Sequence, residues 1–563
     1  MKARAWTVVF LLLISAATLT GKKNTTDYDF IISNARVVDG TGAPWFIADI
    51  GIVNDRIAAI GDLHAASAKQ KIDATGLVAS PGFIDVQGQS EFNLLVDNRA
   101  ASKITQGVTT EITGEGESIA PVNDRQIKEA ADGAKKYNVP QDWHSLDEYF
   151  QHLDRIHPAI NLGTFVGAGG IRSYVVGEDN RGATPAELDQ MRQLVAQSME
   201  QGAFGLSSAL QYVPDVYAST DEIVELAKVA HKYGGVYFTH QRSEADQIFP
   251  SLDEVFAISQ GAEIPATIWH LKTAYSENFG KMPEVLNRIA AARARGIDVA
   301  ASMYPYARAS NGLDACFPSW VLEGGTDKMI ARLKDPAQRA RAQREMIETA
   351  TTWQNQWLGS GGPSGVQLNQ VLNPDLKKYE GMTFDEIGRQ MGKDPRDAAM
   401  DIAIADHGNS YVVIAIMDEN DVRAAIANPL VTFGSDSPAQ AEDGPLSQSK
   451  AHPRAFGTMP RVLAKYVRDE HVISLEEAIR RMTSLAANRV KIMDRGILRP
   501  GMFADIAVFD SGTIKDVASY TDPLHYSVGV KAVFVNGRPV LLDGKITDQR
   551  PGRALRGPGY RAY

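Results

Sequence analysis

The sequence predicts an α/β protein in which a (β/α)8 TIM-like barrel is joined to a small β-sandwich domain formed from both chain ends. Short β-rich segments lie near both ends of the 563-residue chain. The chain between them alternates short apolar segments with longer helical ones, and eight of these apolar segments are candidate barrel strands. Such alternation is typical of βα units around a parallel sheet. A chain several times longer than one ordinary domain has room for both parts.

Residues 28–80 and 495–550 are predicted to form the β domain, in which Asn536-Gly537 is a strong signal for a hairpin turn. Residues 81–490 are predicted to form the barrel. Its eight candidate strands are 82–86, 108–112, 160–166, 203–207, 236–239, 266–269, 298–304 and 430–435. The gap before the last strand is far longer than a βα connection needs and holds a glycine-rich stretch, so we expect an insertion at about 308–390.

The composition limits the class of protein. Hydrophobic residues are 44% and charged residues 22% of the chain, which is close to the globular average and excludes long disorder or a polytopic membrane protein. The net charge of −10 provides no basic field, so we expect no nucleic-acid partner. The single cysteine, Cys316, excludes an intrachain disulfide and a cysteine-rich metal cluster. Histidines and carboxylates must therefore provide most of the ligands of any metal.

Residues 1–22 have the order of a bacterial Sec-type secretory signal peptide. Lys2 and Arg4 precede an apolar run at 6–14, and small residues follow at 15–17. The apolar run is short for a membrane-spanning helix. We expect an exported, periplasmic protein without stable membrane insertion after signal removal. The alternative is an uncleaved membrane anchor.

Three polar residues stand at the predicted carboxyl ends of barrel strands, where the active sites of such barrels lie. His240 and His270 end the fifth and sixth strands, and Asp436 follows the eighth. A single buried histidine is more often a core residue, but two on adjacent strands favour a metal site. Neutral imidazoles suit zinc, and a catalytic zinc has three protein ligands and an open position for water. Asp436 is placed to take a proton from that water, which predicts a hydrolytic site.

Short motifs in order along nearly the whole chain after the signal peptide resemble the N-acyl-D-amino-acid deacylases (D-aminoacylases) of the amidohydrolase superfamily. They include PGFID at 81–85, QGVTT at 106–110, FGLSS at 204–208, THQR at 239–242, GSD at 434–436, HPR at 452–454, GTMPR at 457–461 and RPGMFAD at 499–505. Each motif is weak alone, and the ordered set is specific. The resemblance implies the same barrel and split β domain. It also implies a zinc-dependent hydrolase that cleaves the linear amide bond of N-acyl-D-amino acids to a carboxylate and a free D-amino acid.

Two departures from the family pattern indicate a divergent branch. Most relatives carry His-x-His after Pro-Gly-Phe-Ile-Asp, whereas this chain has Gln87-Gly88-Gln89. An amide oxygen is a poor zinc ligand compared with imidazole, so we expect one tightly bound zinc ion. Where relatives often have a ligating cysteine, this chain has Glu115, with Glu117 as the second choice. The resemblance thus implies that Glu115, His240 and His270 hold the metal. The alternative is that Glu115 is a solvated loop carboxylate.

Substrate recognition requires cations that can bind a carboxylate, and arginine can do so with two parallel hydrogen bonds. Arg242, Lys272 and Arg454 lie beside motif residues at the predicted barrel mouth, although each alone is more often a surface charge. The resemblance favours Lys272, Tyr304 and Arg454 as substrate contacts. Tyr212 is expected to line the acyl pocket or to pack in the core. The expected partner is a small N-acylated amino acid or peptide-like molecule.

Other functions are compatible with the same residues. A dipeptidase or a cyclic-amide hydrolase of the superfamily would share the metal site and differ in the pocket. A non-catalytic exported binding protein is the alternative from a different class, and the missing histidines motivate it. Retention of His240, His270 and Asp436 together favours the enzyme.

Overall fold

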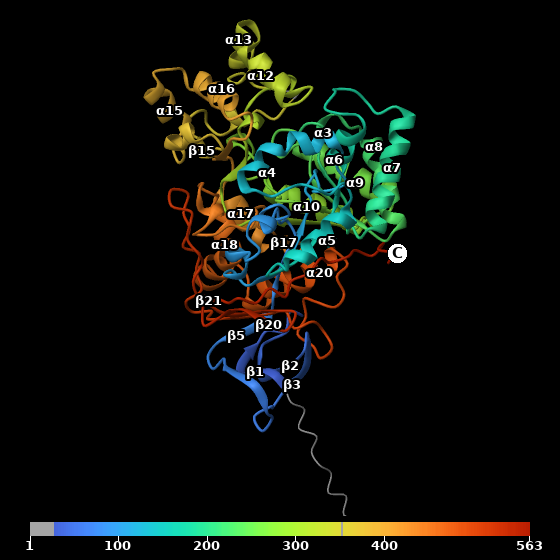
Figure 1. Cartoon of the computed structure of the whole chain (residues 1–563), viewed down its shortest axis with the longest axis vertical. Coiled ribbons are helices and arrows are strands. Elements are labelled where there is room, and N and C mark those ends of the chain that lie inside the picture. The colour runs from blue at the N-terminus through green and yellow to red at the C-terminus, as the bar shows by residue number, and fades with distance from the viewer. Residues whose placement is uncertain (1–27, 351–352, 563) are drawn as a thin grey trace, which may run out of the picture.

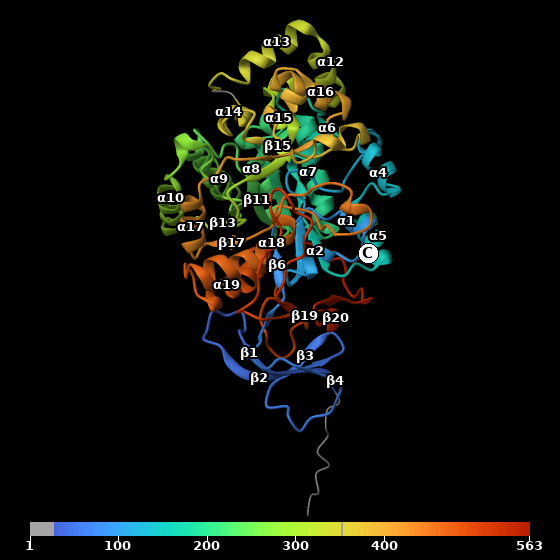
Figure 2. The ribbon, with the colours of Figure 1, turned by 90° about the vertical axis from the view of Figure 1, so that its left-hand side faces the viewer.

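The computed structural model describes residues 28–350 and 353–562, so the signal peptide predicted at residues 1–22 lies outside the described residues. Three parts follow one another along the long axis of the molecule (Figure 1). The β domain lies at one end, the barrel in the middle and an inserted segment at the other end, and Figure 2 shows the same order from the side. No helix among the described residues is long and apolar enough to cross a bilayer.

The barrel is a ring of parallel strands. The third of them is divided at Phe165 into two short strands. The strands are β6 (Phe83–Asp85), β7 (Val108–Thr113), β8 (Asn161–Thr164), β9 (Val166–Gly167), β10 (Gly205–Ala209), β11 (Val236–His240), β12 (Ala266–Ile268), β13 (Val299–Met303) and β17 (Val431–Phe433). They pair in parallel in the orders β6-β7-β8 and β9-β10-β11-β12-β13-β17. An isolated parallel bridge between Gly88 and Ser437 joins the two ends of the ring. The predicted barrel fold is confirmed.

Amphipathic helices cover the outside of the barrel (Figure 2). They include α7 (Pro185–Glu200), α8 (Thr220–Lys232), α9 (Ile248–Ala262), α10 (Met282–Ala294) and α17 (Glu419–Ala427). In α8, Ile223, Leu226, Ala227 and Ala230 recur at helical spacing and are all buried. The Ser219 side chain accepts a hydrogen bond from the backbone N–H of Glu222 and so fixes where α8 begins. Burial of these faces against the strands holds the carboxyl ends of the strands in place.

Strands from both chain ends form one nine-stranded sheet. The N-terminal part of the chain supplies β1 (Tyr28–Val37), β2 (Phe46–Val53), β3 (Arg56–Gly61), β4 (Ala68–Asp73) and β5 (Val78–Pro81). The C-terminal part supplies β18 (Ile506–Phe509), β19 (Val530–Val535), β20 (Arg538–Leu542) and β21 (Lys545–Ile546). β5 and β18 pair antiparallel and join the halves. Asn536 and Gly537 form the two-residue hairpin loop with positive φ, as such a turn requires. Ile50 and Ile506 share one apolar core.

The inserted segment carries its own sheet and core. β14 (Ala309–Gly312), β15 (Val366–Gln370) and β16 (Tyr411–Ile414) form an antiparallel sheet in the order β14-β16-β15. The helices α12 (Thr326–Lys334), α13 (Pro336–Glu345), α15 (Phe384–Met391) and α16 (Pro395–Ala405) pack with it around a separate apolar cluster. The segment extends beyond the expected end at residue 390, because its central strand is β16. One face of this segment meets the mouth of the barrel.

Candidate active site

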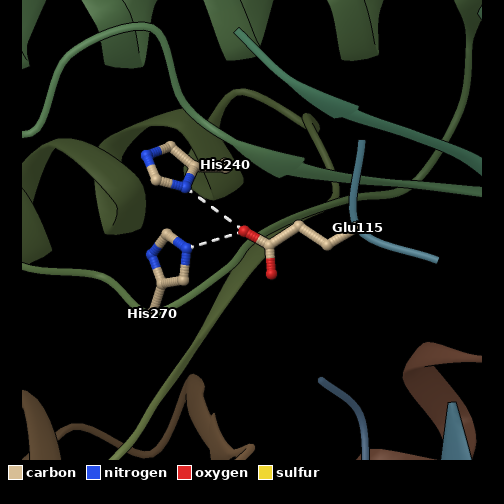
Figure 3. A group of neighbouring side chains, drawn as sticks. All are labelled: Glu115, His240 and His270. Carbon is tan, nitrogen blue, oxygen red and sulfur yellow. Dashed lines mark hydrogen bonds and ion pairs between the residues drawn. The ribbon is translucent and has the colours of Figure 1, made fainter. Parts of the chain in front are cut away.

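Three side chains from different barrel strands converge at the mouth of the barrel (Figure 3). His240 ends β11, His270 lies just after β12 and Glu115 lies just after β7. The Oε1 atom of Glu115 lies 3.2 Å from His240 Nδ1 and 2.9 Å from His270 Nε2. Burial opposes ionisation of Glu115, but the two histidines hold its pKa well below the usual range. The three residues thus meet as one group of a carboxylate and two imidazoles.

This group has the chemistry and spacing of a zinc site. Its three candidate ligand atoms lie within 4.8 Å of one another. The ligand atoms of a tetrahedral zinc site are separated by about 3.4 Å, which follows from bonds of about 2.1 Å. Among residues 28–350 and 353–562, no second group of this kind occurs, and Glu117 is not part of the one found. Glu115, rather than Glu117, therefore completes the set with His240 and His270.

Polar partners behind the histidines fix their orientation. His240 Nε2 lies 3.0 Å from Gln211 Oε1, and His270 Nδ1 lies 2.9 Å from Glu244 Oε1. A hydrogen bond on the far ring nitrogen is how proteins usually orient a histidine that binds metal. Burial opposes ionisation of Glu244, but Lys272 and the histidines lower its pKa below the usual range. Sequence reasoning missed Glu244, although it stands only four residues after His240.

Two glutamines that follow β6, Gln87 and Gln89, act as hydrogen-bond donors. Gln87 Nε2 donates to Glu115 Oε2 at 2.8 Å, and Gln89 Nε2 donates to Asp436 Oδ1 at 2.9 Å. Each amide therefore holds one carboxylate of the site. The amide nitrogen that faces the carboxylate has no lone pair for a metal, so this side of the site differs in chemistry from a histidine pair.

Asp436 projects into the same cavity from the turn after β17. Its φ of 50° is in the left-handed region, as is the φ of 35° at His270, so both chain turns are unusual for non-glycine residues. Burial raises the pKa of Asp436 to about 6, although the nearby cation of Arg454 lowers it. Arg454 Nη1 lies 2.6 Å from Asp436 Oδ2. A carboxyl group with this pKa is suited to move protons near neutral pH.

A sealed cluster of charges holds the turn that carries Asp436. Lys103, in α2 (Ala101–Ile104), donates to Ser435 Oγ at 2.7 Å and to the Ser437 carbonyl at 2.8 Å. The same ammonium lies 2.9 Å from Asp85 Oδ2 and 3.3 Å from Glu111 Oε1. Lys103, Asp85 and Glu111 are fully buried. The two residues on either side of Asp436 are thereby tied to the first and second strands.

The site opens into a cavity of about 510 Å³ whose wall includes Tyr212, Lys272, Tyr304 and Asp436. Tyr304 is only 1% exposed, and its buried hydroxyl has no hydrogen-bond partner among the described residues, so its hydrogen-bonding capacity is unused there. Lys272 Nζ lies 2.5 Å from Glu244 Oε1, and Arg454 stacks 4.6 Å from the Tyr304 ring. The structure thus gathers Lys272, Tyr304 and Arg454 around Asp436.

Tyr212 lies on the other side of the site. Its ring packs edge to face against His240 at 4.8 Å, and its hydroxyl accepts a hydrogen bond from Asn311 of β14 at 3.3 Å. It therefore both supports a candidate metal ligand and lines the cavity. The two expected roles of Tyr212, cavity lining and packing, occur together.

Arg242 is not a cavity residue, which corrects its assignment as a substrate contact. Its guanidinium binds both carboxylate oxygens of Glu254 in α9, at 2.8 and 2.9 Å. The same guanidinium donates to the backbone carbonyls of Val216 and Ala218. The N–H donors of Arg242 are therefore directed at other groups of the protein. Arg242 therefore fastens the loop after β11 to its helix.

Comparisons with known proteins agree over nearly the whole chain. A family model described as "Amidohydrolase family" matches residues 386–541 of this chain. A D-aminoacylase of Alcaligenes xylosoxydans xylosoxydans is 34% identical over 94% of this chain and 97% of its own. An N-acyl-D-aspartate deacylase of the same organism is 34% identical over 94% of this chain and 95% of its own.

Solved structures give the same result. A D-aminoacylase crystal structure has a TM-score of 0.77, with 32% identity, over 94% of this chain and 100% of that one. An N-acyl-D-glutamate deacylase of Bordetella bronchiseptica, complexed with zinc and a phosphonate inhibitor, has a TM-score of 0.78, with 30% identity, over the same shares. The chain belongs to the N-acyl-D-amino-acid deacylase (D-aminoacylase) family of the amidohydrolase superfamily, whose relatives are metal-dependent hydrolases.

Proposed function

We propose that this protein is a zinc-dependent hydrolase that cleaves the linear amide bond of N-acyl-D-amino acids. The products are a carboxylate and a free D-amino acid. The observation that carries the proposal is the meeting of Glu115, His240 and His270 beside Asp436 at the wall of one cavity. The names of the relatives and the zinc in one related structure support the substrate class and the metal.

We propose one zinc ion, held by Glu115, His240 and His270. When bound, zinc polarises an acyl carbonyl and lowers the pKa of water. Gln87 and Gln89 support a single ion, because their amide nitrogens face Glu115 and Asp436 and leave no histidine pair for a second one.

In the proposed mechanism, Asp436 acts as general base and then as general acid. Its carboxylate takes a proton from the attacking water and returns it to the nitrogen of the leaving amino acid as the amide bond breaks. Gln89 keeps one oxygen of Asp436 in place by its hydrogen bond. The α-carboxylate of the substrate binds Arg454, Lys272 and the free hydroxyl of Tyr304.

The test combines metal analysis with a substrate panel. Purified protein should contain one zinc per chain by mass spectrometry and should hydrolyse N-acetyl-D-amino acids much faster than their L enantiomers. Hydrolysis of cyclic amides alone would contradict the linear-amide assignment. No bound metal and no turnover would indicate the non-catalytic binding protein instead.

We also propose export to the periplasm, which the charged, apolar and small-residue order of residues 1–22 supports. Mass spectrometry of the N-terminus of protein from a periplasmic fraction should find a chain that begins near residue 23. A full-length chain confined to the cytoplasm would contradict export.

A further inference from the structure

His452 is a buried histidine outside the candidate metal site, and it lies where three parts of the molecule meet. It precedes α18 (Arg454–Arg461), after the eighth strand of the barrel, and is 3% exposed. Its ring packs against Tyr306, which follows β13, with centroids 5.5 Å apart, and against Tyr520, in the β-domain loop between β18 and β19, at 5.2 Å. Arg308, at the start of the inserted segment, provides a third contact. His452 therefore touches the barrel, the β domain and the insertion.

The hydrogen bonds of His452 define one neutral tautomer. Its Nδ1 atom accepts from the backbone N–H of Arg454 at 3.0 Å, so Nδ1 carries no proton. Its Nε2 atom lies 3.0 Å from the carbonyl oxygen of Arg308, which can only accept, so Nε2 carries the proton. Burial and the cation of Arg454 hold the pKa of His452 well below the usual range. Both ring nitrogens are thus engaged, which fixes the ring in one orientation.

The hydrogen bond to Arg454 serves the first turn of α18. The first N–H groups of a helix have no partner within the helix, and Pro453, which precedes Arg454, has no side-chain group that can accept. His452 provides the acceptor instead. The far end of the helix has its own anchor, because Arg461 Nε donates to the carbonyl of Pro305 at 2.7 Å. Loss of His452 should therefore free the first turn and leave the helix in place.

The guanidinium of Arg454 is only partly held by its own contacts. Nη2 donates to the carbonyl of Ser310 in β14 at 3.2 Å, and Nη1 lies 2.6 Å from Asp436 Oδ2. The guanidinium lies over the Tyr304 ring, 4.6 Å from its centroid. Nε has no hydrogen-bond partner among the described residues. The direction of this unused N–H beside Asp436 therefore depends on the backbone that His452 holds.

We propose that His452 is a positioning residue, which holds the first turn of α18 so that Arg454 faces Asp436 and the α-carboxylate of the substrate. The inference rests on the proposed function, in which Arg454 binds that carboxylate. His452 itself touches no reacting atom, because the protein uses both of its nitrogens. A guanidinium binds a carboxylate best through two parallel hydrogen bonds in one plane, so a small turn of the Arg454 backbone weakens substrate binding. Loss of His452 should therefore raise KM.

Two amide side chains at position 452 separate the two hydrogen bonds of the ring. In His452→Asn, the amide oxygen stands near the place of Nδ1 and can accept from an N–H two residues further on, as asparagine side chains commonly do. In His452→Gln, the amide nitrogen reaches the place of Nε2 and donates to the Arg308 carbonyl, but the N–H of Arg454 loses its acceptor. KM for an N-acetyl-D-amino acid should rise about 10-fold in His452→Gln and less than about two-fold in His452→Asn. In both variants kcat should change less than KM.

A double variant shows whether His452 acts through Arg454. Arg454→Met should raise KM on its own, and His452→Gln should add less than about two-fold to the loss of kcat/KM in that background, because residues that act as one unit are not additive. Ser527→Ala is the matched control. Ser527 Oγ donates to the carbonyl of Phe456 in α18 at 2.6 Å, so this variant removes one hydrogen bond to the same helix away from Arg454. Its KM should stay at the wild-type value, even where its thermal midpoint falls.

The outcomes separate this inference from the proposed function. Equal KM values for His452→Asn and His452→Gln would contradict the inference, and so would a full additional loss in the Arg454→Met background; the deacylase function stands in both cases. If His452→Gln does not fold, His452→Asn carries the test: a wild-type KM supports the inference and a 10-fold higher KM, of about the size expected for a lost carboxylate contact, overturns it. If the zinc-loaded wild type hydrolyses no N-acyl-D-amino acid, the proposed function fails and the inference fails with it.

Discussion

Two buried clusters of ionisable groups meet at the carboxyl ends of the barrel strands, and they differ in what they face. The cluster of Glu115, His240 and His270 faces the cavity. The cluster around Lys103 faces only protein, and its ammonium contacts Asp85 and two groups of the turn after β17. Both are buried, so burial alone does not distinguish them. The open cluster, of Glu115, His240 and His270, can act on a ligand. The closed cluster, of Lys103 and its partners, can only stabilise the fold.

The largest effect is expected at Asp436. It lines the same cavity as the open cluster, and the closed cluster holds the turn on which it lies. Asp436→Asn should lower kcat/KM by about 10²–10⁴-fold, because it removes the proposed general base and acid. The zinc content should stay at the wild-type value, since Asp436 is not a proposed ligand. Steady-state kinetics and metal analysis on the same preparation measure both. Turnover at the wild-type rate with zinc bound would rule out this role.

The closed cluster should affect stability instead. Lys103→Met leaves Asp85 and Glu111 buried without their counter-charge, which should lower the free energy of unfolding by about 3–5 kcal/mol. Urea denaturation followed by fluorescence measures this change. Lys69→Met is the matched control: Lys69 pairs with Asp29, but it is 79% exposed, so its loss should cost about 0–1 kcal/mol. Equal effects of the two variants would contradict the distinction between a closed and a surface pair.

Gln89→Ala should have a smaller effect on catalysis and should also change its pH dependence. The pKa of Asp436 is raised to about 6, so the base is lost as the pH falls through about 6. Gln89 donates to Asp436 and favours the ionised form, so its removal should raise that pKa and move the acid limb of kcat to higher pH. We expect kcat to fall about 10-fold. A lower kcat with an unmoved acid limb would mean that Gln89 does not act through Asp436.

Arg242→Met should have the smallest catalytic effect. Its contacts are with Glu254 and backbone carbonyls, so KM for an N-acyl-D-amino acid should change less than about two-fold, whereas the thermal midpoint should fall. Arg454→Met, which removes a cation from beside Asp436, is the contrasting variant and should raise KM. A comparable increase in KM for both variants would support a role for Arg242 in substrate binding.

The meeting of His240, His270 and Asp436 was predictable because the carboxyl ends of parallel strands meet at one mouth, whereas Glu115 was expected there only from the resemblance to the family. The partners of those residues were not. Glu244 and Gln211 lie in loops, and the sequence does not define the path that brings a loop side chain back to a histidine. Arg242 was misassigned for the same reason, because the chain turns toward α9 immediately after β11.

The extent of the insertion was underestimated on similar grounds. A short apolar segment such as β16 has the same pattern whether it joins the barrel or a separate sheet. Its pairing with β14 and β15 depends on residues about 40–100 positions away, which local patterns do not encode.

The join between β5 and β18 has a consequence for how the chain is made. Synthesis proceeds from the N-terminus at about 5–20 residues per second, so β18 emerges tens of seconds after Pro81, the last residue of β5. During that interval one edge of the early strands has no partner, and exposed strand edges favour aggregation. The nine-stranded sheet therefore cannot be completed until the last part of the chain is available to pair with the N-terminal strands.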